Sequence, residues 1–276
     1  MRTMSTPKLL AAIREHGALV YGTGYVAKLF RRGLHEQGLD ACVRAHVVSG
    51  TVADDATCEG KPVRCARDYA FDGELVCVAV HESNRADVEA LLLELGVTTS
   101  VWVYYNLFDL MYGEPIERGR RVPVTTILRA QDPGCHWLDV RALAIKGLLA
   151  DEPLGESAYL KAQAMHSSPH TARKRHELLS SLVASVTRDG FDPTRPVLLT
   201  EDLMIIDGLH RISLAWCLGE PELDCNIVAT TPRYEELLNR EVRLPEAMLR
   251  KVGLTPEERE ALDAVHREME IGADHV

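Results

Sequence analysis

A strand that passes directly into a helix through an Asp-Gly pair is the feature that most constrains how this chain folds. Two short apolar runs, at 196–200 and 203–206, predict two β-strands around a Glu-Asp turn. Asp207 and Gly208 follow the second run, and the helical spacing of the apolar residues after them ends at Gly219. The sequence therefore predicts two strands, a tight corner and a helix.

The residues at this corner suit the binding of a phosphate. A helix N-terminus carries N–H groups without intrahelical partners and the positive end of the helix dipole. Gly208 lies there, Arg211 adds a fork-shaped donor for phosphate oxygens, and His210 adds a donor or proton carrier. Asp207 offers a metal ligand or a proton acceptor. The structural alternative is that Asp207 caps the helix and Arg211 forms a surface ion pair.

The pattern Asp-Gly-x-His-Arg, followed by a helix of small residues that ends in Leu-Gly, resembles the signature of the ParB/sulfiredoxin superfamily. The order of the preceding segments is also similar: a long helix over 176–189, then Gly190, the strand from Pro196, a turn and a second strand. The resemblance covers about 137–228. It implies an α+β domain that binds nucleotide phosphates.

Departures from the family patterns distinguish its branches. Sulfiredoxins carry a reactive cysteine just before the His-Arg pair, where this chain has Leu209, and ParB partition proteins have a Gly-Glu-Arg-Arg type of motif. Free-serine kinases are similar to Asp-Gly-His-His-Arg, which this chain matches except at Leu209. The resemblance thus implies a kinase that uses ATP or ADP with Mg²⁺. Gly208, His210 and Arg211 would surround the phosphates, and Asp207 would hold the metal or orient the acceptor hydroxyl.

The kinases of this family resemble one another in a glutamate early in the domain, which acts as general base on the acceptor. The equivalent region, 142–158, offers Glu152 and Glu156. We favour Glu156 because it lies at the start of an expected helix over 157–165. Either glutamate is equally well explained as a first-turn residue that favours the helix dipole.

Three further residues are candidate phosphate contacts. Ser168 precedes Pro169 and is expected to cap the next helix, with a nucleotide contact as the alternative. Arg173 and Arg175 belong to a short basic cluster. The cluster is expected to be a solvated helix face, with a phosphate-gripping lid as the alternative.

The N-terminal half alternates strands and helices, which predicts a parallel sheet with helices on both faces. Its expected strands are 18–21, 41–48, 75–80 and 97–105, and its expected helices are 7–16, the segment that ends at Gly38, and 84–95. The first strand leads into Gly-x-Gly-x-x-Ala, a pattern typical of dinucleotide or nucleotide-sugar binding. The candidate phosphate loop consists of Gly22, Thr23, Gly24 and Tyr25.

Two observations limit what this loop implies. The second strand ends in Val47-Val48-Ser49-Gly50, without the acid that would hold a ribose hydroxyl of NAD. Gly24 is alternatively explained by tight packing of the helix on the strand. The layout of the Gly-Thr-Gly turn, Gly60-Lys61-Pro62-Val63 and the strand 76–80 resembles the small Rossmann-like domains at the front of sugar-modifying and capsule-biosynthesis proteins. That resemblance covers about 18–105 and implies a sugar-nucleotide or glycan context.

Charge, cysteines and hydropathy restrict the partners. With 31 Lys and Arg against 41 Asp and Glu, the net charge of −10 argues against nucleic acid, whose binding depends on cations that neutralise phosphates. The seven cysteines are scattered without Cys-x-x-Cys spacing, as expected for reduced thiols in a cytoplasmic protein. No apolar run is long enough to span a bilayer, so no membrane partner is expected.

These patterns predict an α/β chain in four parts. A Rossmann-like domain covers 1–113, a linker 114–136, a ParB/sulfiredoxin-like domain 137–230 and C-terminal helices 231–276. The brief apolar run 122–128 within the linker indicates a bridging strand. One of the C-terminal helices is expected from Thr231-Pro232 and another from the capping box of Thr255 and Glu258. We expect them to pack or to form a homo-oligomer.

Three functions follow as hypotheses. The first is a small-molecule kinase that phosphorylates a hydroxylated metabolite such as an amino acid or a sugar precursor. The second is a non-catalytic, nucleotide-responsive ParB-like regulatory protein. The third is an NAD- or nucleotide-sugar-linked enzyme that uses the N-terminal domain.

Overall fold

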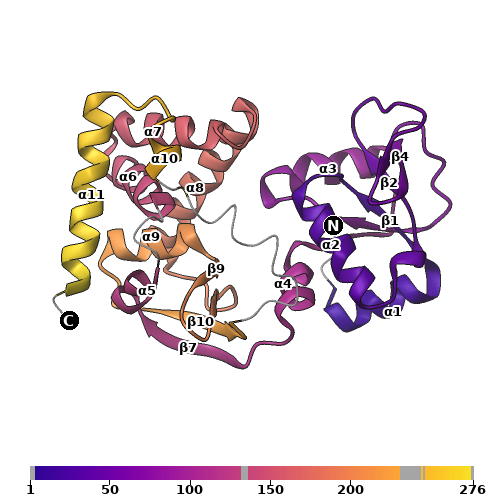
Figure 1. Cartoon of the computed structure of the whole chain (residues 1–276), viewed down its shortest axis with the longest axis horizontal. Helices are drawn as coiled ribbons and strands as arrows, with labels where there is room; N and C mark the ends of the chain where they lie inside the picture. The colour runs from indigo at the N-terminus through magenta and orange to yellow at the C-terminus, as the bar shows by residue number, and fades with distance from the viewer. Residues whose placement is uncertain (1–3, 132–135, 231–243, 245, 275–276) are drawn as a thin grey trace. The chain divides into compact units, whose positions relative to one another are not determined.

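A computed structural model of the chain describes residues 4–131, 136–230, 244 and 246–274 (Figure 1). The chain divides into two compact units, which we call the N-terminal unit (Met1–Gly113) and the C-terminal unit (Glu114–Val276). Both combine helices with a sheet, so the protein is mixed α/β. None of the described helices has the length and apolar character that crossing a membrane requires.

The N-terminal unit is built on a six-stranded sheet in the order β3-β4-β2-β1-β5-β6. β1 pairs in parallel with β2 and β5, β2 with β4, and β5 with β6, whereas β3 pairs antiparallel with β4. The strands are β1 (Ala18–Tyr21), β2 (Val43–Val48), β3 (Thr57–Cys58), β4 (Lys61–Cys65), β5 (Leu75–Val78) and β6 (Ser100–Trp102). The parallel pairing predicted from the alternation of strands and helices is present.

Helices cover both faces of this sheet, because successive side chains of a strand point to opposite sides. Ala18 and Val20 of β1 belong to one core and Leu19 and Tyr21 to another. The first core includes residues of α1 (Thr6–His16), α2 (Tyr25–Glu36) and α4 (Tyr104–Tyr112), and the second includes residues of α3 (Glu82–Glu94). A 3₁₀ turn, η1 (Asp40–Cys42), precedes β2, so the strand expected from residue 41 begins two residues later.

The end of the expected strand 97–105 forms a helix instead. β6 is limited to Ser100–Trp102, and α4 begins at Tyr104. The run Val-Trp-Val-Tyr-Tyr is rich in aromatic and β-branched residues, which favour strands. Leu107 and Leu110, however, are both buried at helical spacing, and Leu110 belongs to the core that α4 shares with α1 and α2. Tertiary burial therefore outweighs local propensity here.

The C-terminal unit has a mixed four-stranded sheet in the order β7-β10-β8-β9. β10 is antiparallel to β7 and parallel to β8, and β8 is antiparallel to β9. The strands are β7 (Glu117–Pro123), β8 (Val197–Thr200), β9 (Ile205–Asp207) and β10 (Glu222–Val228). β8 and β9 lie at the two apolar runs from which they were predicted.

The helices of this unit share one core with the sheet. In Figure 1 most of these helices lie above the strands, and the yellow C-terminal helix runs along their outer side. The helices are α5 (Val124–Ala130), α6 (His136–Ala150), α7 (Pro153–Ala164), α8 (Pro169–Asp189), α9 (Leu209–Leu218), α10 (Glu246–Leu249) and α11 (Pro256–Asp274). α7 starts four residues before the helix expected at 157–165.

The segment 114–136 is not the linker that its polar sequence indicates. Its described part supplies β7, α5 and the first residue of α6, and Val122, Val124 and Ile127 are buried in the core of the C-terminal unit. Among the described strands β7 pairs with β10 alone, so it is an edge strand, and all its side chains but Val122 are exposed. The Arg- and Gly-rich composition therefore belongs to an edge strand.

The C-terminal helices also belong to this unit. Leu249 of α10 and Leu262 and Val265 of α11 are buried in the same core as α6. The helix expected from Thr231 lies outside the described residues.

Candidate functional site

The Asp-Gly corner has the local geometry that the sequence predicts. Asp207 ends β9, and α9 begins at Leu209. Gly208 is the N-cap between them, with a left-handed φ of 110°. A Cβ at this position would lie 3.0 Å from the side chain of Val197 on the neighbouring strand β8. Both the backbone conformation and the close approach of Val197 therefore require glycine here.

Arg211 fastens this corner to the start of β8. Its guanidinium donates to a carboxylate oxygen of Asp207 at 3.0 Å and to the carbonyl oxygens of Arg195 and Pro196, the latter at 2.9 Å. Asp207 and Arg211 are 27% and 17% exposed, so this is a half-buried pair rather than a surface one. Arg211 thus orients Asp207 and places a fixed positive charge at the N-terminus of α9.

His210 turns toward α7. Its Nε2 atom lies 3.1 Å from the hydroxyl oxygen of Tyr159, a side chain that is fully buried. Burial raises the pKa of Tyr159, so the hydroxyl stays protonated at neutral pH. The structure therefore directs His210 and Arg211 to different neighbours from adjacent positions of one helix.

Glu156 and His176 extend this group. The Glu156 carboxylate lies 3.7 Å from Nδ1 of His176 on α8, and the ring of Tyr159 lies 5.7 Å from the His176 ring and 6.3 Å from the His210 ring. The Nε2 atom of His176 is buried without a hydrogen-bond partner among the described residues. We call Glu156, Tyr159, His176 and His210 the α7–α9 cluster.

The remaining candidate residues of the C-terminal unit lie outside the α7–α9 cluster. Glu152 is exposed at the N-cap of α7. Ser168 caps α8, because its hydroxyl accepts from the amide of Thr171 at 3.2 Å. Arg175 donates to the buried side chain of Gln163 on α7 at 2.7 Å, and Arg173 is exposed.

A close contact between α6 and α7 places the cluster. A Cβ on Gly155 would lie 2.3 Å from the carbonyl oxygen of Leu143, and one on Gly147 would lie 2.7 Å from that of Glu152. Two glycines thus let the helix backbones touch, which fixes α7 and the side chains of Glu156 and Tyr159 on it.

Neither Tyr159 nor His176 was among the site residues expected from the sequence. Tyr159 lies three residues after Glu156, so both fall on one helical face, and that spacing is the signal that was available. His176 was visible only as part of a long helix. Its place beside Glu156 depends on how α8 packs against α7.

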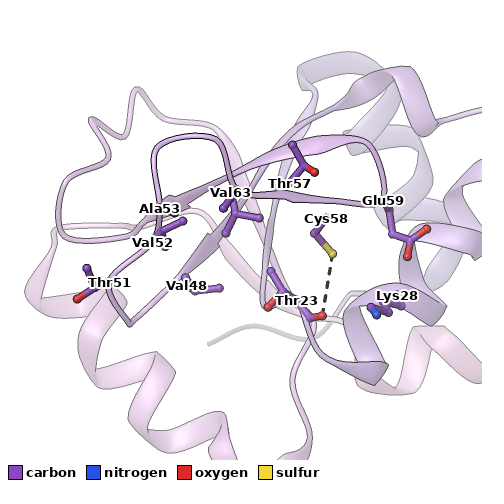
Figure 2. Close-up of a pocket in the computed structure, with 11 residues that line it drawn as sticks. Thr23, Lys28, Val48, Thr51, Val52, Ala53, Thr57, Cys58, Glu59 and Val63 are labelled. Atoms are coloured by element: carbon purple, nitrogen blue, oxygen red, sulfur yellow. Dashed lines mark hydrogen bonds between the residues drawn. The ribbon is translucent and has the colours of Figure 1, made fainter.

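The N-terminal unit has a pocket of about 490 Å³ beside its glycine loop (Figure 2). Thr23 and Lys28 lie on one side of it, and Cys58 points toward the carbonyl oxygen of Thr23 at 4.0 Å. The other lining residues are Val48, Thr51, Val52, Ala53, Ala56, Thr57, Glu59 and Val63. The pocket thus lies where β1 and β2 end, as ligand crevices of parallel sheets do.

The glycine loop beside this pocket is fixed by the contacts of Gly22. Gly22 has a φ of 113°, and a Cβ on it would lie 3.0 Å from the carbonyl oxygen of Ala79. Its carbonyl oxygen accepts from Nδ1 of His46 at 2.7 Å. Gly24 is the N-cap of α2 with open space around its Cβ position, and Tyr25 is the first residue of that helix.

Comparisons with known proteins assign no family to the chain. No protein-family model matches it, and neither does any curated protein or solved structure. The function proposed below accordingly rests on the chemistry of the two sites.

Proposed function

We propose that the C-terminal unit is a ParB/sulfiredoxin-like domain that acts as a small-molecule kinase. It transfers a phosphoryl group from ATP or ADP to a hydroxyl group of a metabolite such as an amino acid or a sugar precursor. The observation that carries the proposal is the half-buried Asp207–Arg211 pair at the N-terminus of α9. His210 of the same turn hydrogen-bonds to Tyr159 and so belongs to the α7–α9 cluster.

Phosphoryl transfer depends mainly on positioning and on neutralising charge. The N-terminus of α9 and the guanidinium of Arg211 attract the phosphates of the nucleotide. His210 hydrogen-bonds to Tyr159, and this contact fixes the ring next to the corner.

The corner also fits Mg²⁺, which proteins often bind through one or two carboxylates and the phosphates of the substrate. Asp207 is partly exposed and has Arg211 on one of its oxygens, so it would hold the ion while Arg211 orients it. When bound with the nucleotide, Mg²⁺ supplies charge neutralisation on the phosphate oxygens.

The acceptor side is formed by Glu156. Its carboxylate is half-exposed and lies beside His176, so it is accessible to a substrate hydroxyl and is oriented by a neighbouring ring. In the proposed reaction Glu156 accepts the hydroxyl proton, and His176 is a positioning residue. Glu152 is exposed at the N-cap of α7 and lies outside the α7–α9 cluster, which favours Glu156 as the base.

Nucleotide binding and turnover test the proposal separately. ATP, ADP or CTP should raise the melting temperature of the full chain, and Arg211→Ala should remove this shift, whereas Arg188→Ala, an exposed arginine on α8, should keep it. Glu156→Gln should keep nucleotide binding and lower turnover by about 100-fold or more. No turnover with any of a broad panel of serine-, inositol- and sugar-like acceptors contradicts the kinase, and binding without turnover favours a ParB-like regulatory protein.

A second function is favoured by the pocket of the N-terminal unit. We propose that this Rossmann-like domain binds a nucleotide-sugar or NAD, with the Gly22–Gly24 turn and Lys28 toward the phosphates and Glu59 toward a sugar hydroxyl. A melting-temperature shift with UDP-sugars or NAD that is lost in Gly24→Val and reduced in Lys28→Gln supports it. Equal shifts in the wild type and Gly24→Val contradict it.

A further inference from the structure

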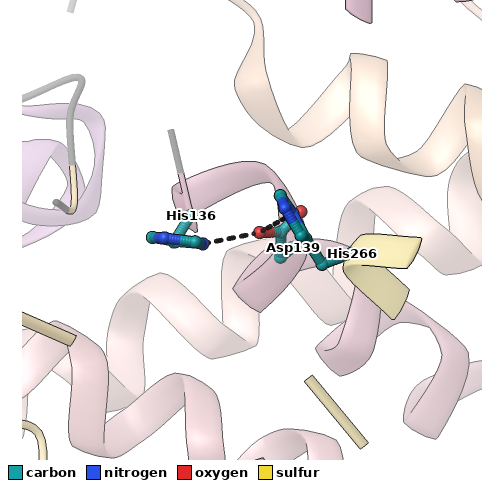
Figure 3. A group of neighbouring side chains, drawn as sticks. All are labelled: His136, Asp139 and His266. Carbon is teal, nitrogen blue, oxygen red and sulfur yellow. Dashed lines mark hydrogen bonds and ion pairs between the residues drawn. The ribbon is translucent and has the colours of Figure 1, made fainter. Parts of the chain in front are cut away.

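Three side chains that the proposed reaction does not use meet where α11 packs against α6 (Figure 3). His136 and Asp139 lie one turn apart on α6, and His266 comes from α11. Within the described part of the chain, this is the one group of at least three such residues whose potential metal ligands all lie within 4.8 Å of one another.

Both imidazole rings turn the same atom toward one buried carboxylate oxygen. Oδ2 of Asp139 lies 2.9 Å from Nδ1 of His136 and 3.0 Å from Nδ1 of His266, and Asp139 is 4% exposed. Ligands bound about 2.1 Å from one ion lie about 3.0 to 3.4 Å apart in octahedral or tetrahedral arrangements. The separations from Oδ2 to the two nitrogens are thus close to those of ligands that share a metal.

The far nitrogen of each ring faces a second carboxylate. Nε2 of His136 lies 3.5 Å from Glu246, and Nε2 of His266 lies 3.3 Å from Glu270. A metal-binding histidine usually donates its other N–H to a carboxylate or carbonyl, which fixes the ring and its tautomer. Both rings have such an outer carboxylate. A proton held on Nε2 leaves the lone pair of Nδ1 available to bind an ion.

The surroundings favour additional positive charge. Asp139, Glu246 and Glu270 face the two rings, and Asp263 adds to the negative potential at His136. Two positive groups offset part of this negative charge, because Arg250 and Arg259 contact Glu246 at 2.9 and 3.8 Å. A bound cation would balance the negative charge of the buried Asp139 carboxylate.

We propose that His136, Asp139 and His266 bind a divalent transition metal, for which Zn²⁺ is the probe. Nδ1 of each ring and a carboxylate oxygen of Asp139 are the ligands, and water completes the shell. Imidazole nitrogen with carboxylate suits zinc or ferrous iron, whereas Mg²⁺ prefers oxygen. Each neutral ring binds the ion as the Nε2–H tautomer, with its proton toward Glu246 or Glu270, and an imidazolium would first release its Nδ1 proton to solvent. The ion joins α6 to α11, a role independent of phosphoryl transfer.

Calorimetric titration of the EDTA-treated full chain with Zn²⁺ tests this site. We expect one ion per chain and a higher melting temperature with the metal. His266→Gln should weaken binding by at least about 100-fold, because loss of an outer partner alone often costs 10- to 100-fold. His170→Gln, an exposed histidine on α8, is the matched control and should bind as the wild type does. No saturable binding, or equal binding by wild type and His266→Gln, overturns the proposal.

A spectroscopic measurement on the wild type keeps the test independent of any variant's folding. Long-range ¹H–¹⁵N spectra of the imidazoles should show Nδ1 of His136 and His266 shifting on addition of one equivalent of Zn²⁺, while His170 stays unchanged. One bound ion that leaves both Nδ1 signals in place lies elsewhere and overturns the assignment.

Discussion

Lys161 on α7 donates to both carboxylate oxygens of Glu258 on α11, at 2.8 and 2.7 Å. Ser157 and the amide of Thr255 donate to the same carboxylate, each at 2.6 Å, and Glu258 is 2% exposed. The capping box that the sequence predicts at the start of α11 is therefore also the point at which this helix is joined to α7.

Replacing Glu258 should destabilise the C-terminal unit. Glu258→Gln leaves the partly exposed Lys161 beside a neutral group, and the loss of its charge-assisted hydrogen bonds should cost about 1.5 to 3 kcal/mol. Chemical denaturation at pH 7 measures the change. Glu260→Gln, an exposed neighbour, should change the free energy of unfolding by less than about 0.5 kcal/mol.

The same carboxylate sets a pH dependence. Burial raises the pKa of Glu258, but donation from Lys161, Ser157 and Thr255 outweighs it and holds the pKa below its usual value. A lowered folded-state pKa gives stability that is present above the unfolded value of about 4.3 and is lost as pH falls through the folded value. As the pH falls below about 4.3, the free energy of unfolding should decrease more steeply for the wild type than for Glu258→Gln. Parallel plots of unfolding free energy against pH would contradict this role of Glu258.

His46 should make the N-terminal unit less stable in mild acid. Arg31 can only donate, so Nε2 of His46, 3.0 Å away, accepts and Nδ1 carries the proton given to Gly22. Burial lowers the pKa of His46, so below about pH 6.5 the unfolded chain takes up a proton that the folded chain does not. Stability should fall as pH drops from 7 to 5, by at most about 1.4 kcal/mol per pH unit from this group.

His46→Leu provides the comparison. It should lower the stability at pH 7 by about 2 kcal/mol, because Arg31 is buried and loses an acceptor. Its stability should change less between pH 7 and 5 than that of the wild type. The same slope in both proteins would place the acid sensitivity elsewhere.

Gly155→Ala should be among the most destabilising single changes in the C-terminal unit. The added methyl group would meet the Leu143 carbonyl at 2.3 Å, and backbone cannot move aside as a side chain can. We expect a loss of about 3 kcal/mol or more from this overpacking. Gly50→Ala is the control, because nothing lies within 4 Å of its Cβ position. Thermal unfolding measures the melting temperatures of the two variants. Equal values would contradict the close α6–α7 contact.

The two loop glycines of the N-terminal unit should behave differently. Gly22→Ala strains a φ of 113° and brings Cβ to 3.0 Å from the Ala79 carbonyl, so it should cost about 1 to 3 kcal/mol. Gly24→Ala should change stability by less than about 1 kcal/mol, because its Cβ position is open. Denaturant titration of both variants measures this difference, and a larger loss for Gly24→Ala would contradict the loop geometry.

The sequence by itself determined the elements whose causes are local. Two short apolar runs specified β8 and β9, the Asp207-Gly208 pair specified the corner, and a Ser-Pro pair specified the start of α8. Such signals need only neighbouring residues, because strand period, caps and φ preferences act within a few positions. The same holds for the alternation that produced a parallel sheet in the N-terminal unit.

Only the tertiary structure decided which side chains meet. Tyr159 reaches His210 across 51 residues and His266 reaches Asp139 across 127, and both contacts depend on which helix faces pack together. Packing also turned the polar run 117–123 into an edge strand of the sheet and the aromatic run from Tyr104 into a helix. Local periodicity states which face of an element is apolar, but the partner of that face is set by the whole core.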